Sequence, residues 1–130
     1  MKAICLESER LILKPLSLSF LSKEYVNWMN DTEVNEFLSS GGDYSLHKLK
    51  VFLSEVEKNE ILFWAVIIKH SGKHIGNIKI DPVEIKHGIC EYGIMMGDKT
   101  EWGKGFAKES SKLVIEFCFK SLNLRKMNLG

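Results

Sequence analysis

The nine residues from Ile61 to Lys69, ILFWAVIIK, restrict the possible folds of this chain most strongly. They form a short, continuous apolar run that is rich in aromatic and β-branched side chains. Such a run is typical of a β-strand that is buried on both faces, because a strand with one solvated face shows polar side chains at alternate positions. We therefore expect the centre of a β-sheet here.

Two further strands are predicted directly after this run. The segments HIGNIKIDPV, residues 74–83, and ICEYGIMM, residues 89–96, have strand character, and the stretches HSGK and EIKHG between the segments are typical of turns. The three strands together predict an antiparallel meander. Tyr92, in the last of them, is expected to face the core.

Helical patterns lie on both sides of the meander. Ser45 suits the N-cap of a helix that ends near Asn59, and residues 106–122 form an amphipathic pattern with lysines and a glutamate on the solvated side. No repeat or linker interrupts the chain, so we expect one domain over residues 1–130. The remaining expected elements are a strand from Arg10 that Pro15 ends, a helix from Ser19 to Asp31, a short helix from Thr32 and a final strand within residues 123–129.

Charge and cysteine content exclude several classes of protein. The 130 residues include 18 Lys or Arg and 17 Asp or Glu, so the formal net charge of +1 lacks the excess of a dedicated nucleic-acid-binding protein. The three cysteines have no CxxC spacing, and His70 and His74 flank a glycine turn, so no disulfide framework or metal site is expected. Without a signal peptide or an apolar run of about 18 residues, we expect a soluble, cytoplasmic protein without a membrane partner.

The stretch GDKTEWGKGFAKES, residues 97–110, places two glycines around Lys104 directly before the last predicted helix. A strand, a glycine-containing turn and a helix N-terminus form an anion site, because free N–H groups point outward and the helix dipole adds about half a positive charge. The spacing matches neither a Walker loop nor G-x-G-x-x-G. This chemistry predicts a site for a pyrophosphate-bearing ligand, and the alternative is a tight turn whose glycines serve only packing.

The same stretch resembles the acetyl-CoA motif of the GCN5-related N-acetyltransferase (GNAT) family, and in particular the ribosomal-protein alanine acetyltransferase branch, where it commonly reads W-G-K-G-Y-A-x-E. The segments ERLILKPL, YVNWMND, HIGNIKI, EYGIMMGD and LNLRKMNL extend the resemblance over almost the whole chain. One departure is a tryptophan in place of the Arg or Gln of the general motif. The matching residues here are Trp102, Gly103, Lys104, Gly105, Phe106, Ala107, Lys108 and Glu109.

The resemblance implies an α+β fold, a mixed α/β sandwich with a central, mostly antiparallel sheet flanked by helices. It also implies an N-acetyltransferase that uses acetyl-CoA and acetylates a small-molecule or peptide amine: a protein N-terminus, an amino sugar or a polyamine. In this family the fourth strand splays from the fifth and offers backbone groups to the cofactor. The cofactor-binding residues expected from the resemblance are Ile94, Met95, Met96, Trp102, Gly103, Lys104, Gly105, Phe106 and Ala107.

Acetyl transfer to an amine needs a group that removes the amine proton. Glu91 lies two residues before Gly93 and so on the same strand face, where it could act as this base through a water; the alternative is a structural hydrogen-bond acceptor. The resemblance places Trp28 and Asp31 beside the acceptor cleft as substrate-binding residues. The alternatives are a core anchor for Trp28 and a helix N-cap for Asp31.

The family fold continues after its fifth strand with a helix and at least one further strand, whereas this sequence ends at Gly130. We therefore expect the C-terminal helix and strand to be missing. The apolar surface left uncovered would make the 130-residue chain either a homo-oligomer or less stable and less active than a longer chain. The alternative to an enzyme is a non-catalytic module that binds CoA or another protein.

Overall fold

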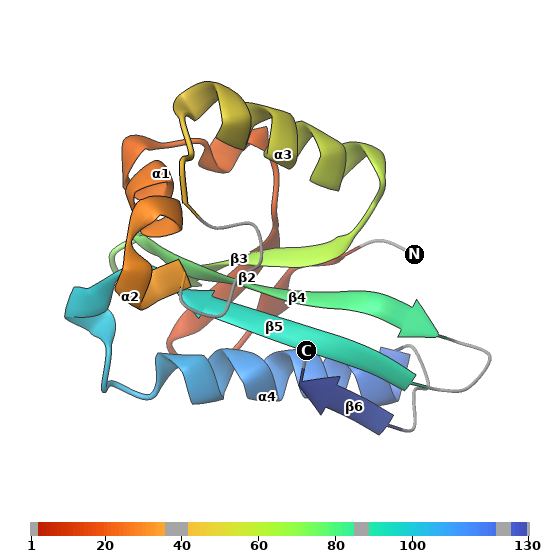
Figure 1. Cartoon of the computed structure of the whole chain (residues 1–130). Coiled ribbons are helices and arrows are strands. Elements are labelled where there is room, and N and C mark those ends of the chain that lie inside the picture. The colour runs from red at the N-terminus through yellow and green to blue at the C-terminus, as the bar shows by residue number, and fades with distance from the viewer. Residues whose placement is uncertain (1–2, 36–41, 85–88, 122–125, 130) are drawn as a thin grey trace.

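The computed structural model describes residues 3–35, 42–84, 89–121 and 126–129. Its centre is a six-stranded sheet in which the strands follow one another in chain order (Figure 1). Neighbouring strands are antiparallel except the last pair, which is parallel. The strands are β1 (Leu6–Glu7), β2 (Leu11–Pro15), β3 (Leu62–Ile68), β4 (His74–Glu84), β5 (Ile89–Met96) and β6 (Lys126–Leu129).

The predicted meander is confirmed, because β3 pairs with β4 and β4 with β5, both in antiparallel register. All residues of β3 except the half-buried Phe63 are buried, as expected for the apolar run at the centre of the sheet. Strand β1 was not predicted, since two residues are too short to show a periodic pattern.

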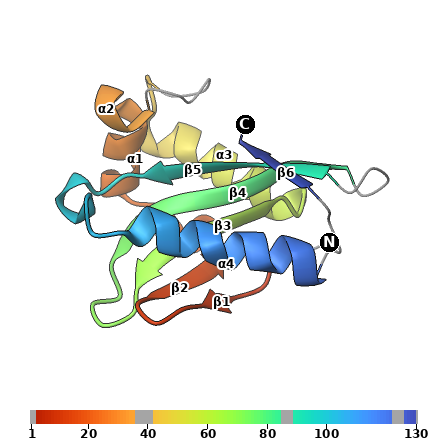
Figure 2. The ribbon, with the colours of Figure 1, turned by 90° about the horizontal axis from the view of Figure 1, so that it is seen from below.

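Helices cover both faces of the sheet, which confirms the α+β fold (Figures 1 and 2). Of the four described α-helices, the first three along the chain lie on one side, and the last and longest crosses the other side. Each side has its own apolar core: Trp64 of β3 belongs to the core beneath the long helix, and its neighbour Ala65 belongs to the core on the opposite face. The helices are α1 (Lys23–Asn30), α2 (Thr32–Asn35) and α3 (Leu46–Lys58) on one side and α4 (Phe106–Ser121) on the other.

Helix α3 is confirmed at both ends. The Ser45 hydroxyl accepts a hydrogen bond from Lys48 N at 3.1 Å, and Asn59 is the C-terminal cap. Capping of this kind depends on residues within one helical turn, so the sequence alone can show it.

The prediction of a single helix from Ser19 to Asp31 is wrong at its start. Leu18–Phe20 forms a separate 3-10 turn, η1, which Ser17 caps. Helix α1 begins only after Ser22, whose hydroxyl accepts a hydrogen bond from Tyr25 N at 3.1 Å. The two serines bind nearby backbone N–H groups and so divide a segment whose apolar spacing favoured one helix.

Strand β6 pairs with only the first half of β5. The parallel register ends with Tyr92 opposite Leu129, so residues 93–96 have a strand partner on the β4 side only, within the part of the chain that the structure describes. The sheet therefore opens between β5 and β6, next to the loop that leads to α4. Tyr92 is half-buried against the core beneath α4, as expected.

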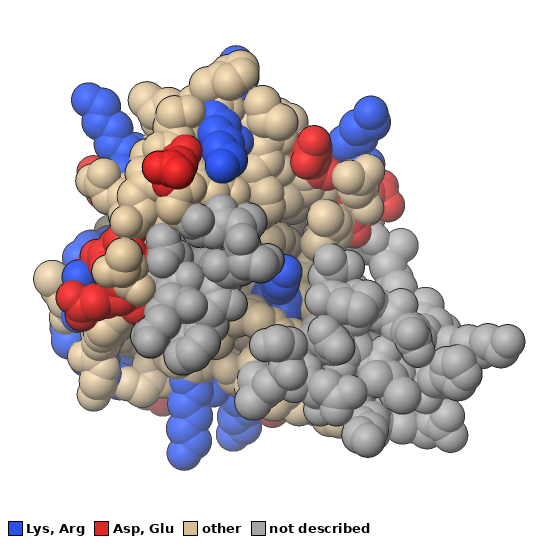
Figure 3. Space-filling model, viewed as in Figure 1, with Lys and Arg blue, Asp and Glu red and all other residues tan. Residues whose placement is uncertain are grey.

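The surface carries both signs of charge. On the described part of the face shown in Figure 3, basic and acidic side chains are interspersed, and neither sign forms a continuous patch. None of the described helices is long and apolar enough to span a membrane.

Candidate active site

The loop between β5 and α4 contains the two glycines around Lys104. After a 3-10 turn, η3 (Lys99–Glu101), both Gly103 and Gly105 have a φ angle of 82°, which glycine adopts without strain. A Cβ at Gly103 would meet no atom within 4 Å. The glycines are therefore needed for the backbone conformation of the loop, and they leave its surface open; close packing does not require them.

The N-terminus of α4 presents free backbone donors. The first amide to bond into the helix is that of Glu109, which donates to Gly105 O at 3.0 Å. Among the described residues, the N–H groups of residues 106–108 have no hydrogen-bond acceptor. These groups and the helix dipole together favour an anion at this position.

A hollow of about 250 Å³ lies at this helix start. Six of the nine residues predicted to bind cofactor line it, so the structure brings most of that set together. Lys104 does not line it, since its ammonium lies 2.7 Å from the Glu101 carboxylate. The lining residues are Met96, Asp98, Glu101, Trp102, Gly103, Gly105, Phe106 and Ala107.

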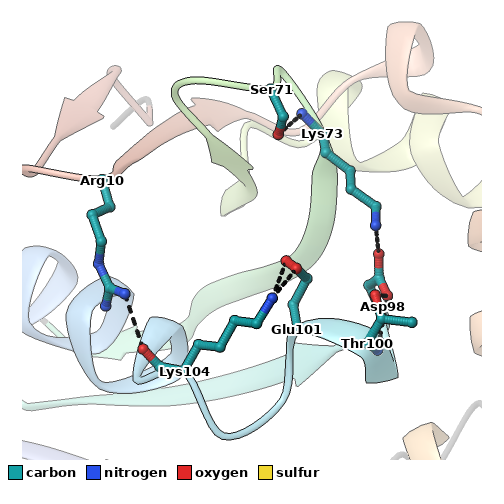
Figure 4. A network of polar contacts seen from close by, with 7 residues as sticks. All are labelled: Arg10, Ser71, Lys73, Asp98, Thr100, Glu101 and Lys104. Atoms are coloured by element: carbon teal, nitrogen blue, oxygen red, sulfur yellow. Dashed lines mark hydrogen bonds and ion pairs between the residues drawn. The ribbon is translucent and has the colours of Figure 1, made fainter.

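Arg10 holds this loop from the residue before β2. Its Nη1 donates to Lys104 O at 3.0 Å (Figure 4), its Nε donates to Glu109 at 2.7 Å, and its guanidinium carbon lies 4.4 Å from the centre of the Phe106 ring. Glu109 also accepts a hydrogen bond from the Ser8 hydroxyl at 2.5 Å. Burial opposes ionisation, but the hydrogen bonds from Ser8 and Arg10 keep the pKa of Glu109 below its usual value. Sequence analysis missed Arg10, because no local pattern connects it with residues more than 90 positions away.

A second ion pair holds the beginning of the loop. Lys73, in the turn before β4, lies 2.6 Å from Asp98, which also accepts hydrogen bonds from the Thr100 N and Oγ1 at 3.0 and 2.5 Å (Figure 4). Burial again opposes ionisation, but the hydrogen bonds from Lys73 and Thr100 keep the pKa of Asp98 below its usual value. In addition, Trp102 Nε1 donates to Met96 O at 2.8 Å. The loop is thus shaped by contacts within the protein.

The open edge of β5 presents backbone groups beside this hollow. Gly97 N donates to Ile75 O on the β4 side. The C=O of the same peptide, Met96 O, points the opposite way and accepts from Trp102 Nε1. The backbone groups of Met96 therefore point away from β4. Backbone groups of a strand alternate between its two edges, so those of Ile94 also point to the open edge.

A second hollow, of about 90 Å³, lies on the opposite side of the sheet, between β3–β5 and helices α1 and α3. We call it the acceptor-side hollow. Ile94 and Met95, which were predicted to bind cofactor, line this hollow, and they directly precede Met96 of the first hollow. The lining residues are Tyr25, Met29, Phe52, Phe63, Asn77, Lys79, Gly93, Ile94 and Met95.

The two predicted substrate-binding residues lie beside the start of the loop. Trp28 is buried, and a Cβ on Gly97 would lie 2.0 Å from its ring, so the indole packs on bare backbone. Asp31 accepts a hydrogen bond from Glu33 N at 2.9 Å, and the nearby Lys99 ammonium, at 2.7 Å, lowers the pKa of Asp31. Both residues therefore have the structural contacts that the sequence left as alternatives, and their binding of an acceptor stays a prediction.

The predicted base, Glu91, lies in β5 opposite Asn128 of β6. Its side chain lies outside the described residues, so its catalytic role also stays a prediction.

Comparison with known proteins connects this geometry with a family. The model of the acetyltransferase (GNAT) domain matches residues 10–129 of the chain. The chain belongs to the GNAT family. A relative, the uncharacterized N-acetyltransferase p20 of Bacillus licheniformis, is 25% identical over 126 residues, which are 94% of this chain and 70% of that protein.

Solved GNAT structures share the fold. A GNAT acetyltransferase from Bacillus anthracis superimposes with a TM-score of 0.80 at 19% identity, covering 95% of this chain and 71% of that one. The spermidine N-acetyltransferase from Vibrio cholerae, in complex with CoA and spermine, has a TM-score of 0.80 at 20% identity, and the match covers 94% of this chain and 71% of that one.

GNAT membership makes this chain an acetyltransferase that uses acetyl-CoA, as the sequence motif implied. The residues of the loop fit such a ligand: among the described residues, the amides of residues 106–108 are free, the space at Gly103 is open, and residues 93–96 of β5 have one unpaired edge. The assignment to the ribosomal-protein alanine acetyltransferase branch stays a prediction.

Proposed function

We propose that this chain transfers the acetyl group of acetyl-CoA to a primary amine. The proposal rests on the position of β5 between two hollows: Met96 lines the one at the α4 N-terminus, and Ile94 and Met95 line the one on the opposite side. A donor and an acceptor that enter from these two sides would meet at this strand. The name of the Bacillus licheniformis relative and the spermine in the Vibrio cholerae complex support an amine as the acceptor.

In this proposal the amides of residues 106–108 donate to the pyrophosphate of acetyl-CoA, and Gly103 and Gly105 keep the approach open. The backbone groups of Ile94 and Met96 bind the amide-containing arm of the cofactor. Bound acetyl-CoA supplies the thioester that the amine attacks.

We assign Glu91 as the group that removes the amine proton through a water. The two-residue spacing predicts that Glu91 shares a strand face with Gly93, which lines the acceptor-side hollow, and this prediction supports the assignment. An alkylammonium has a pKa of about 10, so it must lose a proton before it attacks.

Glu91→Gln tests this role, because glutamine keeps the size of the side chain but cannot take the proton. We expect kcat/KM to fall about 100-fold or more near neutral pH, with an unchanged Kd for acetyl-CoA and partial recovery at higher pH. A variant with the wild-type pH profile would exclude Glu91 as the base.

Two measurements test the function as a whole. Calorimetric titration with acetyl-CoA, ADP and NAD tests the donor, and binding of ADP and NAD without acetyl-CoA would contradict the proposal. Release of CoA thiol in the presence of N-terminal peptides, amino sugars and polyamines tests the acceptor. If acetyl-CoA binds but no amine accelerates thiol release, the chain is a CoA-binding module.

A further inference from the structure

The acceptor-side hollow contains a buried polar group without a partner. Asn77 of β4 is only 2% exposed, and its Nδ2 atom has no hydrogen-bond partner among the described residues. A buried donor left unpaired is unfavourable, because it has lost its hydrogen bond to water, so such a group often marks the position of a ligand atom. Asn77 lines the hollow, where a bound ligand would reach it.

His74 fixes the orientation of this amide. Its Nε2 lies 2.9 Å from Gly76 O and 2.8 Å from Asn77 Oδ1. A backbone carbonyl only accepts hydrogen bonds, so Nε2 carries a hydrogen, and the Asn77 atom that faces it must be the oxygen. Burial lowers the pKa of His74, against the opposing hydrogen bonds, so the ring is neutral at neutral pH. Both N–H donors of the Asn77 amide are therefore turned away from His74.

Two further donors line the same hollow. Lys79 lies opposite Gly93, and its Cε would be 3.5 Å from a Cβ placed there, so the side chain passes over bare backbone. Within the described part of the chain, Lys79 forms no ion pair. Burial and the nearby Tyr44 raise the pKa of Tyr25. The Asn77 amide lies close enough to oppose this rise in part, but the contact does not have hydrogen-bond geometry. The Tyr25 hydroxyl thus stays protonated and can donate.

The described lining of the hollow contains these donors and no Asp or Glu, and the Glu91 carboxylate that we assign as the base would act at the amine end of the acceptor. A carboxylate suits this set of groups, because it only accepts hydrogen bonds and its charge complements the Lys79 ammonium. A second ammonium, as in a polyamine, would instead lie near a like charge. The rest of the wall is apolar and would contact the carbon chain of a ligand; it consists of Met29, Phe52, Phe63 and Met95 with Ile94 and Gly93.

We propose that Asn77 and Lys79 bind a carboxylate of the acceptor, so that the preferred substrates are primary amines that also carry a carboxylate. This inference rests on the proposed acetyl transfer to an amine and specifies its substrate class. Asn77 and Lys79 then determine specificity, and His74 is a positioning residue that orients the Asn77 amide.

The test compares ω-amino acids of about three to six carbons with their carboxamides and with diamines of equal length. For wild-type protein we expect kcat/KM for the carboxylate to exceed that for the carboxamide by about 10- to 100-fold, the range of a charged hydrogen bond. Lys79→Met keeps the length of the side chain and should bring this ratio close to one. Lys112→Met, which removes an exposed charge from α4, is the control and should keep the wild-type ratio.

Asn77→Asp is a second variant. It keeps the oxygen that accepts from His74 but replaces both donors with an acceptor, so the ratio should fall below that of wild type. Equal use of carboxylates and carboxamides by wild-type protein, or a ratio that Lys79→Met leaves unchanged, would overturn the inference.

A binding measurement separates this inference from the proposed function. Titration with butanoate and butanamide, without acetyl-CoA and followed by NMR, should show tighter binding of butanoate that Lys79→Met abolishes. If butanoate binds in this way but no amine is acetylated, the carboxylate site stands and the proposed function fails. If amines are acetylated but butanoate does not bind, the proposed function stands and the carboxylate site fails.

Discussion

Replacing Arg10 by alanine tests whether the loop between β5 and α4 is held in shape by a residue at the other end of the sequence. Arg10 pairs with Glu109 at 2.7 Å, donates to Lys104 O at 3.0 Å and lies 4.4 Å from the Phe106 ring centre. Because the Arg10 side chain is 44% exposed, its ion pair with Glu109 contributes only about 0.2–1 kcal/mol to stability. The hydrogen bond contributes about 0.5–1.5 kcal/mol and the cation–π contact about 0.5–1 kcal/mol.

These contacts share one side chain and are not strictly additive, so we expect Arg10→Ala to lower the free energy of unfolding by about 2 kcal/mol. The same contacts restrain Lys104 and Phe106 on both sides of Gly105. If about 1.4 kcal/mol of the lost stability had kept the loop in its binding conformation, the loop of the variant must be ordered again when acetyl-CoA binds, and the Kd rises about tenfold. Arg10→Lys is the matched control: it keeps the charge but loses the forked geometry, so its effects should be intermediate.

Urea denaturation measures the stability and calorimetric titration with acetyl-CoA measures the Kd. The reasoning is refuted if Arg10→Ala loses about 2 kcal/mol of stability while the Kd stays at the wild-type value, since the contacts would then stabilise the fold without shaping the site.

Three other changes have definite expected outcomes. Gly105→Val, which forces a β-branched residue to a φ of 82°, should raise the Kd for acetyl-CoA at least about tenfold while circular dichroism stays native, whereas Lys104→Ala should change the Kd by less than about threefold. Gly97→Ala places a Cβ 2.0 Å from the Trp28 ring and should lower the free energy of unfolding by about 1–3 kcal/mol; a wild-type melting temperature would contradict the close packing. The folded-state pKa of Asp98 is below its usual value of 3.8, so the Asp98 carboxylate stabilises the fold fully above pH 3.8 and loses this contribution as the pH falls through the folded-state pKa. Asp98→Asn should flatten this acidic part of the profile of unfolding free energy against pH.

Local features of the sequence were enough to predict much of the fold. The apolar run of β3, the turns of the meander and the Ser45 cap involve residues close together in the chain, and the structure confirms all three. The two glycines before α4 likewise predicted a helix N-terminus with free amides, because the first N–H groups of a helix have no acceptor within the helix.

Tertiary structure decided what surrounds that helix start. The contacts of Arg10 with Lys104 and Glu109 span more than 90 residues, and periodicity carries no information about such pairs. The same holds for the acceptor-side hollow, where a residue of α1, Tyr25, comes together with Asn77 and Lys79 of β4. As a strand residue within an alternating pattern, Asn77 gave no functional signal. The orientation of the Asn77 amide is fixed only by the hydrogen bonds of His74 with Gly76 and Asn77. The folded chain puts the Gly76 carbonyl beside His74 Nε2, and this carbonyl determines the tautomer of the His74 ring.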